Sequence, residues 1–271
     1  MVADGYLATD RRVFGDAADT YHRFRPGYDT VVYELLGERC GLKPGIAAFE
    51  VGPGTGQATR TLLAMRIDPL VAIEPDERLA AHIVRDADID GHASALQLQI
   101  ARFEDAELAD GAFHLGVAAT SFHWLEQGSA LTRVAAALRP GGWWAMWWNM
   151  YGEVFGQDPF HEATKHLLEG PGIATTLSDG PRPFPLDADA RRSDLLATGA
   201  FTDIGFELIG RVVPFDAEAT TGLYRTFSGV ASRPVVERER IIDGLARIVD
   251  EEFGGTVERT VLTPVHIARR V

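Results

Sequence analysis

Three alternating glycines form the most informative segment of the chain. Gly52, Gly54 and Gly56 follow an apolar run that ends at Phe49, and Glu50 lies just before the first glycine. Glycine has no Cβ and tolerates positive φ angles, so the backbone of such a turn can approach a ligand closely. A helix-compatible segment follows, and the N–H groups of its first turn would face the bound molecule. The segment is typical of a site for a nucleoside-containing cofactor.

The spacing of the glycines favours one kind of cofactor. Dinucleotide folds use G-x-G-x-x-G, in which the third glycine comes three residues after the second. Here the third glycine comes two residues after the second. A carboxylate at Glu50 would repel a pyrophosphate, but it would attract an ammonium group directly or through water. S-adenosyl-L-methionine (SAM) carries an ammonium group and a sulfonium and has no phosphate. The pattern therefore predicts SAM rather than NAD, and a plain surface turn between strand and helix is the alternative.

A second acid stands at the end of the next expected strand. Residues 69–73 are a buried apolar run, and Glu74, Pro75 and Asp76 follow them. Glu74 lies 22 residues after Gly52 (74 − 52), close to the spacing of about 20 at which such folds place a ribose-binding acid. A carboxylate there accepts hydrogen bonds from both ribose hydroxyls. We predict Glu74 at the ribose, with a solvated acid at a strand end as the alternative.

A polar loop follows the third expected strand, 96–100. It contains Phe103, Glu104, Asp105 and Ala106. An acid at this place can accept from the exocyclic amine of adenine, and an apolar neighbour can cover the face of the ring. The alternative stays open, in which Phe103 is ordinary core and Asp105 caps a turn.

Strands and helices alternate through the first half of the chain. We expect a helix at 30–40, strand–helix units at 46–65 and 70–87, strands at 96–100, 113–119 and 143–148, and a helix at 127–138. This order predicts a parallel sheet with right-handed crossovers, in which ligands bind at the carboxyl ends of the strands. The side chains that fall at such ends are those of Glu50, Glu74, Phe103 and Thr120.

The pattern changes after Asn149. Residues 150–200 are rich in Gly, Pro and Asp, and we interpret them as an insertion over the site with a helix near 160–168. A strand at 201–215, helices at 217–230 and 235–253, and a strand at 257–268 follow, and the last strand is expected at an antiparallel edge. We predict one domain, 1–271, made of an N-terminal helical cover (1–40), a SAM-binding core (41–149), the lid or substrate insertion (150–200) and a C-terminal part (201–271).

Composition limits the partners. The chain has 271 residues, and 26 Lys and Arg against 39 Asp and Glu give a formal net charge of −13 at pH 7. Nucleic-acid partners favour a basic face, so none is predicted. A single cysteine, Cys40, excludes an intrachain disulfide or a cysteine-cluster metal site and suits a reducing cytoplasm. No apolar run is long enough to span a membrane, and the first residues lack a signal-peptide pattern, so we expect a cytoplasmic protein with a small-molecule substrate. No metal is predicted, and the oligomeric state stays open.

The chain resembles the class I SAM-dependent methyltransferases. The matching stretches are FEVGPGTGQATRTLL (49–63), VAIEPDERL (71–79), RFEDAEL (102–108), FHLGVAATSFHWL (113–125) and ALRPGGWWAMWWN (137–149). Residues 14–36 look like the small-molecule subgroup that includes trans-aconitate methyltransferase-like proteins. The resemblance implies an α/β fold, a Rossmann-like seven-stranded mixed sheet whose last strand is antiparallel, with a lid or cap insertion.

The resemblance also implies contacts with each part of the cofactor. They are Glu50 and the backbone of Gly52, Gly54 and Gly56 around the methionine part, Glu74 with Pro75 at the ribose, Phe103 and Glu104 beside the adenine, the backbone of Ala118 and Ala119 toward the amino group, and Tyr21 and Arg25 closing over the site. The sequence departs from the family at His114, where an acid is usual, and at Gly116, which replaces a common β-branched residue and is expected to loosen local packing.

His123 is the candidate catalytic residue. Methyl transfer from a sulfonium is a displacement at carbon, which requires alignment of the reacting atoms and exclusion of water. His123 follows the fourth strand at the mouth of the site, and the imidazole reference pKa of about 6.5 suits a general base. The alternative is a histidine that hydrogen-bonds backbone and packs beside Trp124. A strong base is optional where the nucleophile is already ionised.

Two further groups carry weaker hypotheses. Alternation along 143–148 puts Trp143 and Trp147 on one face and Trp144 and Trp148 on the other, most simply as core under flanking helices. The alternative is that one pair lines an aromatic substrate pocket. Several arginines are candidates to clamp an acidic substrate, although surface placement is the default. They are Arg182, Arg191, Arg192, Arg225 and Arg233.

The interpretation is a SAM-dependent methyltransferase with a small-molecule acceptor, and O-methylation is favoured over N- or C-methylation. Two alternatives stay open at this point. One is a non-catalytic SAM-binding protein, because binding and transfer use many of the same residues. The other is an NAD-dependent oxidoreductase, against which the glycine spacing and the absence of a Tyr-x-x-x-Lys pair both speak.

Overall fold

The computed structural model describes residues 18–152, 158–168 and 182–271, which fall into two compact units. The sheet unit comprises 27–149, 183–209 and 263–271. The helical unit comprises 1–26, 150–182 and 210–262. The predicted N-terminal cover, 1–40, is therefore shared between the units, and so is the predicted insertion, 150–200. The interpretation as one domain stays a prediction.

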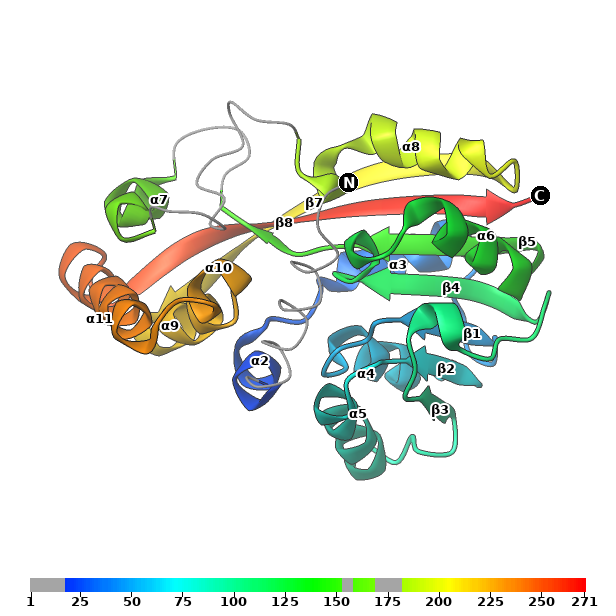
Figure 1. The fold of residues 1–271 in the computed structure, drawn as a ribbon, viewed down its shortest axis with the longest axis horizontal. Helices are drawn as coiled ribbons and strands as arrows, with labels where there is room; N and C mark the ends of the chain where they lie inside the picture. Colours follow the sequence, from blue (N-terminus) through cyan, green and yellow to red (C-terminus); the bar gives the residue numbers. More distant parts are fainter. Residues whose placement is uncertain (1–17, 153–157, 169–181) are drawn as a thin grey trace. The chain divides into compact units, whose positions relative to one another are not determined.

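A mixed sheet forms the centre of the sheet unit (Figure 1). Its strands are β1 (Ala48–Val51), β2 (Leu70–Ile73), β3 (Leu96–Gln99), β4 (Phe113–Ala119), β5 (Leu138–Trp147) and β8 (Thr256–Arg270), in the order β3-β2-β1-β4-β5-β8. The first five strands pair in parallel. β8 runs antiparallel to β5, from Trp143 opposite Arg269 to Trp147 opposite Val265. The predicted fold class, with its antiparallel last strand, is confirmed.

Two more strands pair with β8. β6 (Met150–Tyr151) is antiparallel to it at Leu262 and Val261, and β7 (Phe201–Asp216) also pairs with it. The long strands predicted at 201–215 and 257–268 are therefore present with nearly the predicted bounds. The short β6 was not predicted.

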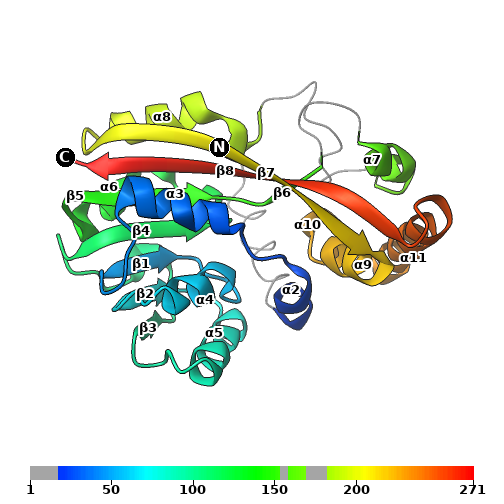
Figure 2. The same ribbon diagram turned by 180° about the vertical axis from the view of Figure 1, so that it is seen from behind.

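Helices cover both faces of the sheet in the sheet unit, with α6 and α8 on the face toward the viewer in Figure 1 and α3 on that of Figure 2. They are α3 (Thr30–Cys40), α4 (Gln57–Ala64), α5 (Glu77–Ile89), α6 (Gln127–Ala137) and α8 (Ala188–Ala197), with short 3-10 turns η1 (Phe103–Asp105), η2 (Phe122–Trp124) and η4 (Phe184–Leu186). The predicted end of α3 is confirmed, because Gly41 has the left-handed conformation that closes it. Asp76 caps α5, since its side chain accepts from the Arg78 N–H.

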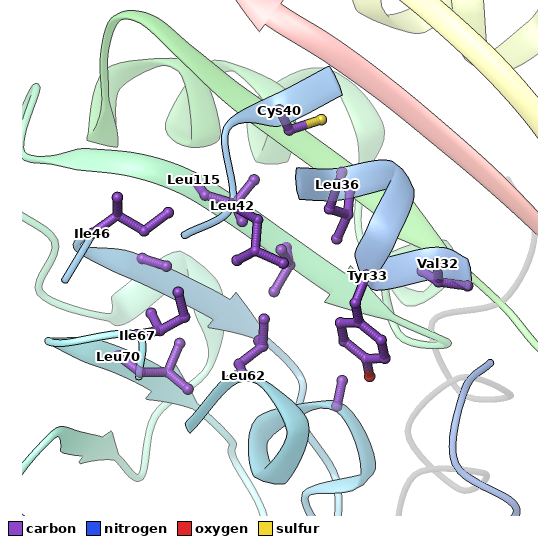
Figure 3. Packing of buried hydrophobic residues seen from close by; sticks show 14 of the residues in the cluster. Val32, Tyr33, Leu36, Cys40, Leu42, Ile46, Leu62, Ile67, Leu70 and Leu115 are labelled. Atoms are coloured by element: carbon purple, nitrogen blue, oxygen red, sulfur yellow. The ribbon is translucent and has the colours of Figure 1, made fainter. Parts of the chain in front are cut away.

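The main core lies between α3, α4 and the strands β1, β2 and β4 (Figure 3). Leu36, Leu62, Leu70 and Leu115 are fully buried there. Burial of a leucine side chain contributes about 1.5–3 kcal/mol. These four residues come from α3, α4, β2 and β4, so the core fixes the strands whose carboxyl ends carry the predicted site.

Gly116 does not loosen the sheet. The ring of Phe49, from the neighbouring strand β1, fills the place of the missing side chain, because a Cβ on Gly116 would stand 2.3 Å from Phe49 Cζ. The ring also stacks on Trp144 at 6.2 Å and meets Phe113 edge-on at 5.2 Å between centroids. The expectation of loose packing was wrong, because a glycine in one strand is matched by an aromatic ring from the next.

The helical unit has a core of its own. Its helices are α2 (Ala18–Phe24), α7 (Pro159–Thr164), the 3-10 turn η3 (Lys165–Leu167), α9 (Ala217–Arg225), α10 (Ser228–Ala231) and α11 (Val235–Glu252). Phe160, Leu223, Leu245 and Val249 are among its buried residues. α2 packs on α9 at Gly222, where a Cβ would stand 2.3 Å from the ring of Phe24.

The predicted insertion is not one structural piece. Residues 183–200 belong to the sheet unit, where α8 packs against α6. The helix expected near 160–168 is present as α7 and η3 in the helical unit. Residues 153–157 and 169–181 of the predicted lid lie outside the described residues.

Candidate functional site

The three glycines form a tight loop between β1 and α4. All have positive φ angles, of 65° at Gly52, 61° at Gly54 and 91° at Gly56, which L side chains rarely adopt. Gly52 donates its N–H to the carbonyl of Ile73 at 2.9 Å. A Cβ on Gly52 would stand only 2.6 Å from Ser121 Cβ. The first glycine is therefore required by packing inside the protein.

Gly54 differs from Gly52 because its outer side is open. A Cβ added there meets no atom within 4 Å in the part of the chain that the structure describes. α4 begins three residues later, at Gln57. Its N-cap is Gly56, which has no side chain that could cap the first N–H groups of the helix. The loop thus offers glycine backbone and helix N–H groups on a side that a ligand can reach, as the predicted cofactor requires.

Glu74 is tied to this loop. Its Oε2 accepts the Gly54 N–H at 2.9 Å, and its Oε1 accepts the Asp76 N–H at 3.0 Å. The side chain is buried, with 5% exposed. A carboxylate accepts hydrogen bonds from hydroxyl groups such as those of a ribose, and the ribose contact of Glu74 stays a prediction. The structure thus brings the predicted ribose acid and the glycine loop together, while Pro75 beside it is exposed.

Glu50 is a fully buried carboxyl group under the same loop. Thr59 Oγ1 donates to its Oε2 at 2.7 Å, whereas its buried Oε1 has no hydrogen-bond partner among the residues that the structure describes. Burial raises the pKa of Glu50 to about 7, the Thr59 hydrogen bond lowers it, and the charge of Glu74 raises it further. An ammonium group would donate a hydrogen bond to Oε1 and favour the ionised form of Glu50. Glu50 therefore fits the role that the sequence gives it.

The carboxyl end of β4 lies against the loop. Thr120 has a φ of 59°, which is rare for a β-branched residue. Its hydroxyl shares a hydrogen bond of 2.8 Å with the Tyr28 hydroxyl, and the hydroxyl of Ser121 donates to the carbonyl of Val51. Tyr28 and Ser121 were not among the predicted site residues. Ala118 and Ala119 are the last two residues of β4, where they pair with β5. Their contact with the cofactor stays a prediction.

The predicted adenine residues lie in η1. Phe103 is buried, and the guanidinium of Arg133 lies over its ring at 5.6 Å from the centroid. Glu104 beside it is exposed. Arg133 also donates to the carbonyl of Ala106, so it holds the loop after β3 onto α6. Sequence reasoning missed Arg133, and the adenine contacts stay a prediction.

His123 lies in η2 within an aromatic group. Its Nδ1 accepts a hydrogen bond of 2.9 Å from the indole N–H of Trp148. Its ring lies 4.7 Å from that of Trp124 and 6.2 Å from that of Phe184. The packing beside Trp124 agrees with the alternative given for this residue, and the catalytic role stays a prediction. The pairing with Trp148 was not predicted.

Tyr21 and Arg25 belong to the helical unit. The Arg25 guanidinium donates to the carbonyl of Thr226 at 3.1 Å and lies over the rings of Tyr21 and Phe227, at 5.1 and 4.8 Å from their centroids. Cation–π contacts of this kind contribute about 0.5–2 kcal/mol each. Arg25 therefore joins α2 to the segment after α9, and the cofactor role of both residues stays a prediction.

The remaining candidates are the tryptophans of 143–148 and the five arginines. Trp144, Trp147 and Trp148 are buried, so the interpretation as core is confirmed for them. Three of the candidate arginines form ion pairs with acids of the protein: Arg191 with Asp194, Arg225 with Glu239 and Arg233 with Glu237. Arg182 and Arg192 are exposed. Among residues 18–152, 158–168 and 182–271 we find no group of three metal-ligating side chains and no helix that meets the length and hydropathy of a membrane span.

Comparison with known proteins places this geometry in a class. Residues 49–146 match the family described as a methyltransferase domain. An uncharacterized methyltransferase of Schizosaccharomyces pombe is 24% identical over 238 residues, which are 86% of this chain and 85% of the relative. An uncharacterized methyltransferase of Mycobacterium tuberculosis is 29% identical over 181 residues, 58% of this chain and 69% of the relative.

Solved structures share the fold. A proposed type II methyltransferase from Anaeromyxobacter dehalogenans aligns with a TM-score of 0.62 and 20% identity over 91% of this chain and 98% of that one. Phosphoethanolamine N-methyltransferase 2 of Haemonchus contortus, in complex with SAM, aligns with a TM-score of 0.54 and 13% identity. The alignment covers 98% of this chain and 58% of the Haemonchus chain.

The fold is that of the class I SAM-dependent methyltransferases. With the methyltransferase domain over 49–146 and the methyltransferase relatives, the protein is a SAM-dependent methyltransferase, and its cofactor is S-adenosyl-L-methionine. This identification replaces the oxidoreductase and the non-catalytic alternatives.

Proposed function

We propose that this methyltransferase transfers the methyl group of SAM to a small-molecule acceptor, and that oxygen is the favoured nucleophile. The main support is the arrangement of Glu74, Gly54 and Glu50. The two acids are buried beside the glycine loop, and Gly54 has space on its outer side. Glu50 would hold the ammonium group of SAM, Glu74 the ribose, and Phe103 with Glu104 the adenine. When bound, SAM supplies an electrophilic methyl group on its sulfonium.

Several observations support a small acceptor. The net charge of −13 disfavours a nucleic acid, whose phosphates prefer a basic face. The Haemonchus enzyme is described in complex with phosphomonomethylethanolamine, a small molecule, although its 13% identity reflects the fold alone. The resemblance of residues 14–36 to the trans-aconitate methyltransferase-like subgroup points the same way. We also propose a cytoplasmic location, which the single, buried Cys40 supports.

Oxygen is favoured because an ionised oxygen needs no strong base. The nucleophile must be aligned with the methyl carbon and sulfur, and water must be excluded. His123 follows β4 at the carboxyl edge of the sheet, where an acceptor would meet the cofactor. A role for this residue at the acceptor is part of the proposal.

A transfer assay tests the proposal. The protein is incubated with methyl-labelled SAM and three separate libraries of carboxylic acids, phenols and amines, and labelled products are counted. We expect transfer to members of the acid or phenol library and release of S-adenosylhomocysteine. Transfer to amines alone would contradict the oxygen preference, and transfer only to a protein or nucleic-acid acceptor would contradict the small-molecule class. Calorimetry with SAM, S-adenosylhomocysteine and NAD is the binding control.

A further inference from the structure

We propose that Trp148 is a positioning residue that holds His123 in the tautomer with its proton on Nε2, so that His123 serves the acceptor as a hydrogen-bond donor and not as a base. The inference deepens the proposed function, on which it rests. It concerns the aromatic group at the carboxyl ends of β4 and β5, inside the sheet unit.

The tautomer follows from the chemistry of the two rings. Trp148 Nε1 lies 2.9 Å from His123 Nδ1. An indole nitrogen donates a hydrogen bond and cannot accept one. Nδ1 must therefore present its lone pair, and the neutral imidazole carries its proton on Nε2. A protonated Nε2 donates a hydrogen bond to a group with a lone pair, such as an oxygen of the acceptor molecule.

Packing holds the indole in place. Trp148 is 2% exposed. Its ring meets that of His266 nearly edge-on, at 6.1 Å and 82°, and that of Phe184 at 5.5 Å and 63°. A buried indole that is fixed on two sides cannot rotate its N–H to another partner without repacking the group.

Two further aromatic rings contact the imidazole. The ring of Trp124 lies 4.7 Å from that of His123, and the ring of Phe184 lies 6.2 Å from it. The ring of Phe184 packs against both His123 and Trp148, so it restrains both side chains. The imidazole is thereby restrained in the orientation that directs Nδ1 at the indole.

This pairing excludes the base role. Protonation at Nδ1 would set two N–H donors against each other and leave a buried indole N–H without an acceptor, which is costly. Nε2 already carries a proton. Neither nitrogen can therefore take a proton from the acceptor while the pair is intact. A donor at Nε2 instead orients the acceptor or stabilises negative charge on it.

Two substitutions of His123 separate the roles. Gln places an amide N–H2 near the position of Nε2 and cannot act as a base, whereas Leu fills the space without a donor. In the transfer assay with the best acceptor from the libraries, we expect His123→Gln to keep activity within about tenfold of the wild type and His123→Leu to lose about a hundredfold. Equal losses of a hundredfold or more in both variants would overturn the donor role.

The tautomer itself is measured without any acceptor. In ¹⁵N-histidine-labelled protein bound to S-adenosylhomocysteine, the His123 signals are assigned by their loss in His123→Gln. We expect Nε2 to give a protonated-type shift and Nδ1 an unprotonated-type shift. Trp148→Phe keeps an aromatic ring but removes the indole N–H, so it should yield a mixture of His123 tautomers. The matched Trp124→Phe should not.

The outcomes of this experiment are independent of the acceptor class. A wild-type protein with its proton on Nδ1, or a Trp148→Phe variant whose tautomer is unchanged, would overturn the inference even if small acceptors are methylated. Conversely, a macromolecular acceptor would contradict the proposed function and leave the tautomer result in place.

Discussion

Glu74 Oε2 and the N–H of Gly54 are joined by a hydrogen bond of 2.9 Å. The bond connects the carboxyl end of β2 to the loop after β1, so an acid from one strand sets the position of the glycine at the end of its neighbour. Glu74 therefore has a structural role in the free protein as well as the predicted role at the ribose. The two roles are coupled, because ligand and loop share one carboxylate.

Removal of the Glu74 side chain is expected to weaken cofactor binding. Hydrogen bonds to a charged group contribute about 1.5–3 kcal/mol each, so Glu74→Ala should raise the Kd for SAM by about ten- to a hundredfold. Glu74→Gln retains an oxygen that can accept the Gly54 N–H and should lose less. Isothermal titration calorimetry measures both. Glu77→Ala, an exposed acid in the first turn of α5, is the control. An unchanged Kd for Glu74→Ala would refute the ribose assignment.

Glu50 is expected to make stability fall as pH rises. Its folded pKa of about 7 lies above the ordinary value of 4.5, because burial disfavours the carboxylate, with Thr59 opposing and Glu74 adding to the effect. The folded state thus holds a proton that the unfolded state has released. The stabilisation is complete below pH 4.5 and is lost as pH rises through 7, and it amounts to about 3 kcal/mol.

Glu50→Gln is the matched variant for this effect. Gln keeps an oxygen for the Thr59 hydroxyl and does not titrate. In urea unfolding from pH 4.5 to 8, the wild type should lose free energy of unfolding relative to the variant. SAM binding should reverse the balance, since an ammonium group favours the carboxylate and its arrival releases a proton near pH 7. Parallel pH profiles of the two proteins would show that Glu50 does not titrate as stated.

Two glycines of one loop are expected to respond differently to the same substitution. Gly52→Ala adds a left-handed strain of about 1–2 kcal/mol and a clash, because its Cβ would stand 2.6 Å from Ser121 Cβ. Gly54→Ala adds the strain alone, since no atom of residues 18–152, 158–168 or 182–271 lies within 4 Å of its Cβ. We expect Gly54→Ala to fold with a modest loss of Tm but to bind SAM poorly, because its methyl group occupies the open side of the loop. Gly52→Ala should lose several more degrees of Tm. Normal SAM affinity in Gly54→Ala would mean that the cofactor does not approach this face.

Local patterns predicted most of the elements. The apolar run 113–119 is β4 and the helix expected at 30–40 is α3, both with the predicted bounds. α8 was not predicted, because Leu195 is its only buried apolar residue among the ten and Pro and Asp precede it. Its buried face is identified only by the packing of α8 on α6 in the structure. A short helix with so weak an apolar stripe carries little periodic signal.

The site was predicted where it depends on strand ends, and missed where it depends on distant pairs. Glu50 lies in the buried strand β1 and Glu74 directly follows the buried strand β2, so the apolar runs predicted that both would lie beside the loop. Ser121, which blocks Gly52, and Trp148, which meets His123, act across the sheet. Such contacts depend on the register of β4 and β5, which no local pattern contains.

His266 is expected to make stability fall at acid pH. It is buried in β8, and its Nε2–H donates a hydrogen bond of 2.7 Å to the carbonyl of Pro185. Burial lowers its pKa to about 4, the Pro185 bond opposes this, and the charge of Arg191 adds to it. The unfolded chain therefore takes up a proton below about pH 6.5 that the folded protein refuses. The stabilisation present above pH 6.5 is lost as pH falls through 4, by about 3 kcal/mol.

Urea unfolding at pH 7, 6, 5 and 4 measures this loss. His266→Gln keeps an N–H donor for Pro185 and cannot titrate, so its free energy of unfolding should change less than that of the wild type over the same range. His166→Gln, at an exposed position, should follow the wild type. If the wild type and His266→Gln lose stability in parallel, then acid sensitivity arises elsewhere and His266 does not stay neutral in the folded protein.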